Sequence, residues 1–174
     1  MNRTTVGGPE LGGGRGAGGV LVLVDPSGAG RSAVAGLLAA ELRPSVHLRA
    51  HDFVRVIRNG QLPPHLPEAG RQNATALAAA AQAAFAYATG GYQVVVECPA
   101  VPPALDTFRR ESRTTGAALH YVVLRSGAAA DDPQAPDARE ARDAHVLDTA
   151  GLTPETTAKS VLDALTHRTH LLGW

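Results

Sequence analysis

Short apolar runs alternate with stretches of helical character from Val20 onward. The runs are rich in β-branched residues, and the segments between them have the composition of the crossover helices that connect parallel strands. This alternation predicts an α/β fold, a three-layer α/β/α sandwich around a five-stranded parallel sheet. The predicted strands are 20–24, 46–49, 93–97, 119–124 and 145–147, and the predicted helices are 32–42, 53–58, 69–89, 103–115 and 154–166.

Residues 1–19 differ from the rest of the chain because they hold eight glycines and few apolar residues. Such a segment cannot recover the entropy that ordering costs, and we expect a flexible leader. Residues 20–174 then form a single domain, whose size suits one hydrophobic core. The polar, acidic and proline-bearing segment 126–140 is expected to be a short mobile loop.

Composition narrows the classes of function. Lys and Arg together number 16 and so do Asp and Glu, and no basic patch with interleaved aromatic residues is found, so nucleic-acid binding is not expected. Cys98 is the single cysteine, which excludes an internal disulfide and suits a reducing cytoplasm. No apolar run reaches the roughly 18 residues that span a bilayer, and no signal peptide is recognisable, so we expect a cytoplasmic protein without a membrane partner.

Two further chemistries find little support in the sequence. The histidines in HRTH, residues 167–170, have no nearby carboxylate or cysteine pattern that would complete a zinc site. No serine stands in the GxSxG pattern of a hydrolase nucleophile. The C-terminal letters THLLGW carry the one tryptophan and can pack either on the domain or on a second chain, so both a monomer and a homodimer stay open.

The most informative motif is DPSGAGRS, which lies between the first predicted strand and the first predicted helix. A phosphate-binding loop occupies this position in its fold, and its backbone N–H groups and the positive end of the helix hold an anion. Ser32 supplies the hydroxyl that the pattern GxxxxGK[ST] uses to bind magnesium. The nucleotide-binding candidates in this motif are Ser27, Gly28, Ala29, Gly30, Arg31 and Ser32.

Two residues depart from that pattern and make it a degenerate Walker A motif. Asp25 stands in place of glycine and Arg31 in place of lysine. Arg31 keeps the positive charge on a larger, planar group, whereas the Asp25 carboxylate opposes a bound anion. Either the two side chains pair across the loop and leave a cradle that binds phosphate weakly, or Asp25 turns outward and Arg31 serves the phosphates.

An ordered series of segments accompanies this loop: VHLRAHDFVRVIRNGQLPPHLPEAGRQN, AFAYATGGYQVVVECPAVPP, LHYVVLR and HVLDTAGLTPETT. With these segments, the sequence resembles the small bacterial P-loop kinases grouped with AAA-type ATPases, close to chloramphenicol phosphotransferase, gluconate kinase and the zeta toxins. The resemblance covers most of residues 20–165. It implies the P-loop nucleoside triphosphate hydrolase/kinase fold with strand order 2-3-1-4-5, and transfer of the γ-phosphoryl group of ATP, with magnesium, to a small-molecule hydroxyl.

The resemblance also assigns roles after the second and third strands. Asp52 retains one of the family's two acidic residues, with His51 in place of the other, and would accept or orient the substrate's proton. Its alternative role is to cap the helix that begins at Phe53. Glu97 closes a strand that usually ends in aspartate in relatives, and with Ser32 it would hold magnesium through water.

The acceptor and the adenine have their own candidate segments. The proline-bearing loop 59–69 and the helix after it correspond to the family's variable acceptor-binding segment. The turn TAGLTPE would contact adenine through Thr149 and Gly151; alternatively it is an ordinary turn in which Thr153 caps the next helix. The candidates for substrate binding are His51, His65, Glu68, Arg71 and Asn73.

Relatives carry a long helical lid between the fourth and fifth strands, and its arginines reach the transferring phosphate. Here only 126–144 separate these strands, and Arg139 and Arg142 stand there among acidic neighbours. We therefore expect a kinase-like phosphotransferase that acts on a small molecule such as a natural product or an antibiotic. The alternative is a kinase-derived protein that has lost ATP chemistry and binds a ligand or partner, or catalyses a different reaction, in the inherited pocket.

Overall fold

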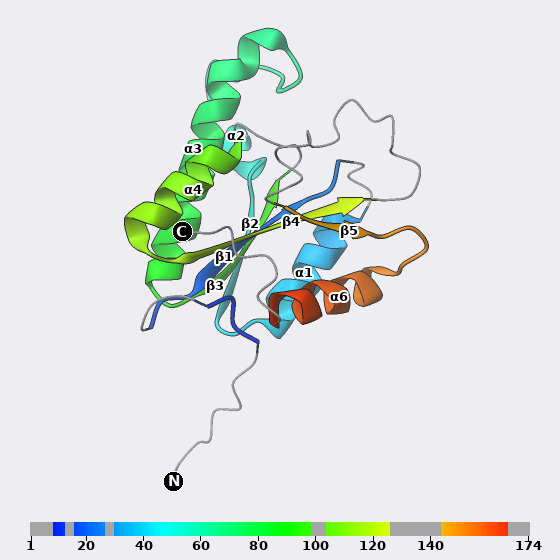
Figure 1. Ribbon diagram of the computed structural model, residues 1–174. Coiled ribbons are helices and arrows are strands. Elements are labelled where there is room, and N and C mark those ends of the chain that lie inside the picture. Colours follow the sequence, from blue (N-terminus) through cyan, green and yellow to red (C-terminus); the bar gives the residue numbers. More distant parts are fainter. Residues whose placement is uncertain (1–8, 13–15, 27–29, 99–103, 126–143, 167–174) are drawn as a thin grey trace.

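A computed structural model describes residues 9–12, 16–26, 30–98, 104–125 and 144–166. They form the predicted five-stranded sheet with helices on both faces (Figure 1). The strands are β1 (Gly19–Val24), β2 (Ser45–Arg49), β3 (Gln93–Cys98), β4 (Ala118–Arg125) and β5 (His145–Asp148). The helices are α1 (Arg31–Glu41), α2 (Asp52–Arg55), the 3-10 helix η1 (Pro67–Ala69), α3 (Gly70–Thr89), α4 (Ala104–Thr115) and α6 (Pro154–Thr166).

The strand order is β2-β3-β1-β4-β5, and every neighbouring pair is parallel. This order is the one that the sequence resemblance implied. Parallel strands all end at the same edge of a sheet, and in this fold class ligands bind outside that edge. The register places Arg49 of β2 beside Glu97 of β3, and Glu97 beside Leu23 of β1. The ends of three strands therefore meet at one place.

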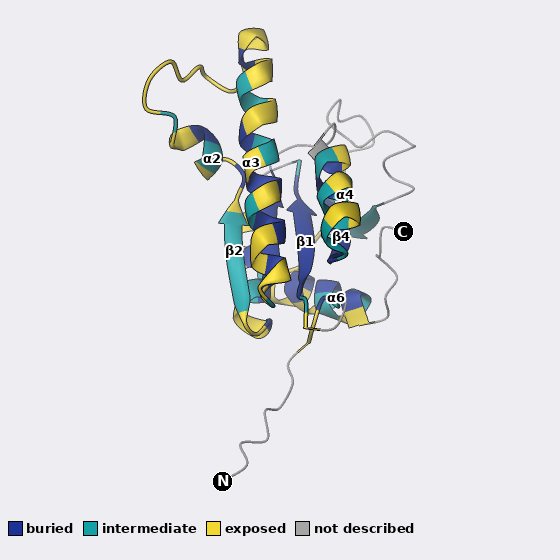
Figure 2. Ribbon diagram, turned by 90° about the vertical axis from the view of Figure 1, so that its left-hand side faces the viewer, coloured by how far each residue is buried: buried dark blue, intermediate teal, exposed yellow. Residues whose placement is uncertain are grey.

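Side-chain alternation along the strands divides the core between the two faces of the sheet. Val20 and Val22 belong to the cluster that includes Phe85 of α3, whereas Leu21 belongs to the cluster that includes Leu38 of α1. Figure 2 shows β1 buried along its length and β2, at the edge of the sheet, only partly covered. None of the helices in the described part of the chain is long and apolar enough to cross a membrane.

The described residues of the N-terminal segment include one, Leu11, that is buried against the sheet. Leu11 is 3% exposed, its N–H donates to Gln93 Oε1 at 2.9 Å, and its carbonyl oxygen is hydrogen-bonded to His120 Nε2. Gly18 donates its N–H to the Ala88 carbonyl at 2.8 Å, and a Cβ there would lie 1.9 Å from the Tyr92 carbonyl oxygen. The high glycine content of residues 1–19 gave no sign that Leu11 is buried and stabilises this segment on the sheet.

The predicted helix 53–58 is also shorter than expected. α2 ends at Arg55, because Val54 is buried whereas Val56 is 65% exposed, so apolar burial stabilises only one turn. The chain then projects as a lobe beyond the sheet, where η1 and the first turns of α3 lie (Figure 1). The Gln72 side chain accepts a hydrogen bond from the N–H of Leu62 and donates one to its carbonyl, which fastens the loop to α3.

Candidate functional site

The first part of the site lies where β1 ends and α1 begins. Of the predicted phosphate loop, Ser27, Gly28 and Ala29 lie outside the described residues. Gly30 precedes the first turn of α1, and its N–H donates to Asp25 Oδ2 at 3.4 Å. The positive end of α1 therefore faces the edge of the sheet where the strands end.

Arg31 reaches back to the residue that follows β1. Its Nη1 donates to the backbone carbonyl of Asp25 at 2.8 Å. This guanidinium contact goes to the main chain of Asp25, whereas the Asp25 carboxylate accepts the N–H of Gly30. The Asp25 side chain is nevertheless buried, with 5% of the residue exposed.

Glu97 is the anionic centre of the site. It is 5% exposed, at the end of β3. Ser32 Oγ donates to its Oε2 at 2.8 Å, and His47 Nε2 lies 2.6 Å from its Oε1. The Nε atoms of Arg31 and Arg49 lie 3.9 Å and 3.8 Å from Oε2 and Oε1, respectively. One buried carboxylate thus faces a hydroxyl, an imidazole and two guanidinium groups.

Two members of this cluster, His47 and Arg49, were not predicted from the sequence. They stand at alternate positions of β2, so both side chains lie on the face that carries Glu97 and α1, whereas Val46 and Leu48 pack on the other face. The signal was present in the letters SVHLR, in which polar and apolar residues alternate. This alternation points to a site only once β2 is known to pair with β3, and no local sequence pattern specifies that pairing.

These residues do not fit the resident magnesium ion that was predicted for Ser32 and Glu97. The Ser32 hydroxyl is engaged with Glu97, and both oxygens of that carboxylate face a guanidinium within 4 Å. Magnesium needs several oxygen ligands in octahedral geometry, and nearby positive groups oppose it. No group of three His, Cys, Asp or Glu side chains in the described part of the chain is arranged to hold a metal ion.

Asp52 reaches the same edge of the sheet through the turn after β2. The N–H of Ala50 donates to the Glu97 carbonyl at 2.9 Å, which fixes the start of α2 beside the end of β3. The Asp52 side chain is 53% exposed and lies 3.9 Å from Arg55 Nη1. The alternative role as a helix cap is wrong, because Asp52 is the first helical residue; His51 precedes it, exposed and without a side-chain cap bond.

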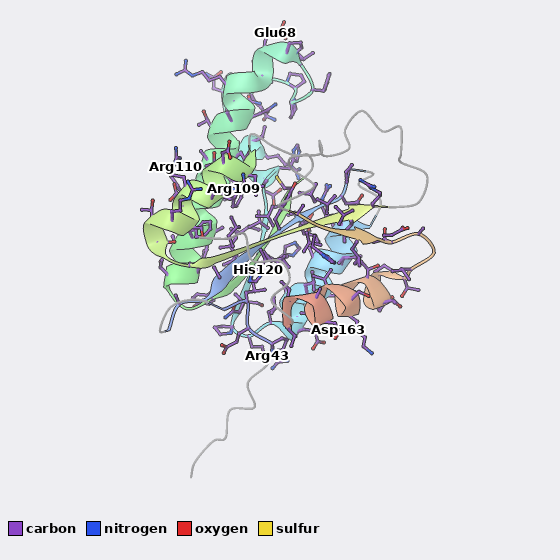
Figure 3. All side chains as sticks on the ribbon, viewed as in Figure 1. Arg43, Glu68, Arg109, Arg110, His120 and Asp163 are labelled. Carbon is purple, nitrogen blue, oxygen red and sulfur yellow. The ribbon has the colours of Figure 1, made fainter. Side chains whose placement is uncertain are left out.

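The other candidates for substrate binding are not gathered around Glu97. His65, Glu68 and Arg71 are exposed on the projecting lobe, and Figure 3 shows Glu68 at its outer tip. Asn73 Nδ2 donates to the Pro64 carbonyl at 2.8 Å, so its amide fastens the loop to α3. Four polar residues close in sequence are thus spread over a surface, because the helix carries them outward.

The turn after β5 is held in place by hydrogen bonds of two threonines, Thr149 and Thr153. Thr149 is fixed to the end of β4, because its N–H and its hydroxyl donate to the Arg125 carbonyl at 2.7 Å and 3.0 Å. Gly151 has φ +71°, which glycine adopts without strain. Thr153 Oγ1 accepts the N–H of Thr156 at 3.2 Å, so the predicted cap of α6 is confirmed. Arg139 and Arg142 lie outside the described residues.

An all-parallel sheet of order 2-3-1-4-5 with helices on both faces, and a phosphate-loop motif between the central strand and α1, define the class. The chain has the α/β fold of P-loop nucleoside triphosphatases and kinases.

Solved structures that are similar to this chain include several kinases and a resistance protein. The Mycobacterium tuberculosis APS kinase, in complex with AMPPNP and APS, has a TM-score of 0.65 at 17% identity over 86% of this chain and 98% of that chain. A gluconokinase from Sinorhizobium meliloti has a TM-score of 0.54 at 16% identity over 86% of this chain and 93% of that chain. The Deinococcus radiodurans tunicamycin resistance protein has a TM-score of 0.61 at 16% identity over 90% of this chain and 99% of that chain. No protein-family model matches the sequence, and a search of curated proteins finds no match.

Proposed function

We propose that the chain is a kinase-like phosphotransferase that moves the γ-phosphoryl group of ATP to a hydroxyl of a small molecule, such as a natural product or an antibiotic. The observation that carries this proposal is the meeting of Arg31, Ser32 and Glu97 where α1 begins beside the ends of β1 and β3. A cation at a helix N-terminus suits a phosphate group. The fold is shared with APS kinase and gluconokinase, and one APS kinase structure contains AMPPNP.

In this proposal Arg31 moves from the Asp25 carbonyl to the phosphates, which it binds through paired guanidinium N–H groups. The turn after β5 flanks the adenine through Thr149 and Gly151. The proposed phosphate-binding residues are Ser27, Gly28, Ala29, Gly30, Arg31 and Ser32.

Asp52 is the proposed general base or orienting group for the acceptor hydroxyl. Its exposure leaves the carboxylate accessible to a bound substrate, at the edge of the sheet where the phosphates are expected. The acceptor itself would bind between this edge and the projecting lobe. The proposed contacts are His51, His65, Glu68, Arg71 and Asn73. No step is assigned to magnesium, because the groups around Glu97 do not fit a resident ion.

Calorimetric titration of the chain with ATP tests this proposal directly. We expect saturable binding, and we expect Arg31→Ala to weaken it about tenfold or more, because a charge-assisted contact to phosphate is lost. The matched control is Arg43→Ala, which removes an arginine just beyond the other end of α1 (Figure 3). Unchanged affinity in Arg31→Ala, with Arg43→Ala also unchanged, would mean that Arg31 does not bind the phosphates.

A second candidate function is favoured by the contact between Arg31 and the Asp25 carbonyl. This contact engages the guanidinium of Arg31 with the protein's own main chain, next to the buried Asp25 carboxylate. A kinase-derived protein that binds a different ligand or partner could keep Arg31 engaged in this way. Absence of any heat with ATP at millimolar concentration would support this second function and exclude the first.

A further inference from the structure

The surroundings of Glu97 suggest a role for its charge that differs from holding a metal. Arg31 Nε is buried and has no hydrogen-bond partner in the described part of the chain. Glu97 Oε2 lies 3.9 Å from Arg31 Nε, a distance that allows an ion pair but is too long for a hydrogen bond. A buried guanidinium N–H that is charge-balanced but not hydrogen-bonded is available to an incoming anion.

Arg49 also lies near the Glu97 carboxylate, beside its other oxygen. Its Nε lies 3.8 Å from Glu97 Oε1, and its side chain is 57% exposed, so its other N–H groups remain open to solvent. His47 and Ser32 hold the two carboxylate oxygens at hydrogen-bond distance. A hydroxyl and an imidazole therefore fix the Glu97 carboxylate, and two guanidinium groups balance its charge.

We propose that Glu97 is a built-in counter-anion that competes with ligand phosphate for Arg31 and Arg49. This inference rests on the proposed function only in that a phosphate group binds at the start of α1. When a phosphate group binds, the guanidinium groups of Arg31 and Arg49 pair with the phosphate instead of with the Glu97 carboxylate. The affinity for phosphate therefore depends on the charge of Glu97 rather than on a divalent cation. In this proposal the negative charge of the buried Glu97 side chain limits the affinity of the protein for phosphate.

The two roles for Glu97 predict opposite effects of one substitution. If Glu97 held magnesium, Glu97→Gln would weaken binding of a metal-bound phosphate. If Glu97 is a counter-anion, the same change removes a negative charge within a few ångströms of the phosphate and tightens binding. Glutamine keeps the shape of the side chain and can still accept the Ser32 hydroxyl bond.

The experiment is a calorimetric titration with inorganic tripolyphosphate, in excess magnesium and again in EDTA, which needs neither adenine recognition nor catalysis. In excess magnesium the two roles predict opposite effects of Glu97→Gln. We expect Glu97→Gln to bind about tenfold more tightly than the unmodified chain. Glu41→Gln is the matched control, because it removes the same charge from an exposed position at the far end of α1; its affinity should equal that of the unmodified chain. Equal or weaker binding by Glu97→Gln, or no binding by any variant, would overturn the proposal.

A measurement on the unmodified chain covers the case in which Glu97→Gln does not fold. Tripolyphosphate affinity is compared in EDTA and in excess magnesium. Equal or weaker binding with magnesium supports the counter-anion role, since the metal lowers the charge of the ligand, whereas binding about tenfold tighter with magnesium overturns it. If tripolyphosphate behaves as expected but ATP is not turned over with any acceptor, the proposed phosphotransferase function fails and the role of Glu97 stands.

Discussion

Asp52 and Asp106 make a natural pair for separating chemistry from local structure. Each lies in the first turn of a helix and each forms an ion pair with an arginine three residues later, at 3.9 Å for Asp52 and 3.3 Å for Asp106. Asp52 is the proposed base, whereas Asp106, in the first turn of α4, has no proposed role in the site. The same substitution at both positions therefore removes equal helix-terminal charge but only one candidate base.

We expect Asp52→Asn to lower phosphoryl transfer by at least about a hundredfold, as for loss of a general base, with a melting temperature like that of the unmodified chain. Exposed helix-terminal charges contribute only about 0.3–1 kcal/mol, so neither variant should unfold. The measurements are turnover and thermal melting, with Asp106→Asn as the control. Full turnover in Asp52→Asn would exclude it as the base.

Residue-level chemistry could be predicted where it lies in a contiguous motif. Arg31 and Ser32 were found because a fixed spacing follows a strand, and Glu97 because it ends one. His47 and Arg49 were missed because their importance depends on which strand β2 pairs with, and that is decided by the whole sheet. Asp52 was assigned to the right edge, but the one-residue shift of the helix start removed its capping role.

At the scale of elements, the sheet was predictable because buried parallel strands are nearly continuous apolar runs. Each strand begins or ends within one residue of its predicted position. The helix predicted at 69–89 is confirmed as α3, whereas a helix that carries little apolar surface was less predictable: α2 stops after one turn. The 3-10 helix η1, which precedes α3, was not predicted. Propensity suggests where a helix can form, and burial decides where it continues.

The packing of α3 against α4 gives a prediction about stability. The rings of Phe85 and Phe108 lie 6.4 Å apart, and Phe108 is fully buried. We expect Phe108→Ala to lower the free energy of unfolding by about 3–5 kcal/mol through lost burial and the resulting cavity. Urea denaturation measures this. Arg110→Ala on the exposed side of α4 should change it by less than about 1 kcal/mol, and a similar loss in both variants would contradict this account.

At the scale of the whole molecule, one of the contacts between the N-terminal segment and the sheet is made by a buried histidine. His120 is 2% exposed in β4, and its Nε2 is hydrogen-bonded to the Leu11 carbonyl. Burial lowers the pKa of His120 below its ordinary value of 6.5, against a smaller opposite effect of that hydrogen bond. The folded chain therefore resists taking up a proton that the unfolded chain binds readily.

This difference makes stability depend on pH in a defined direction. As pH falls below about 6.5, the unfolded chain is protonated first, so the contribution of His120 to folding is complete above that pH and is lost as pH falls toward the lowered pKa. The free energy of unfolding should fall by at most about 1.4 kcal/mol for each pH unit from this group. Denaturation of the unmodified chain and of His120→Gln between about pH 7.5 and 5.5 measures the slope; identical slopes would show that His120 is not responsible.

The position of β2 has one more consequence. Within the described residues this strand is an outer strand, hydrogen-bonded to β3 alone, yet it carries two of the groups that surround Glu97. Outer strands separate from a sheet at lower energetic cost than inner ones. The charge balance around Glu97 therefore depends on a strand that can open locally more readily than the central strands. Local fraying of one border strand would release His47 and Arg49 together while the central frame stays intact.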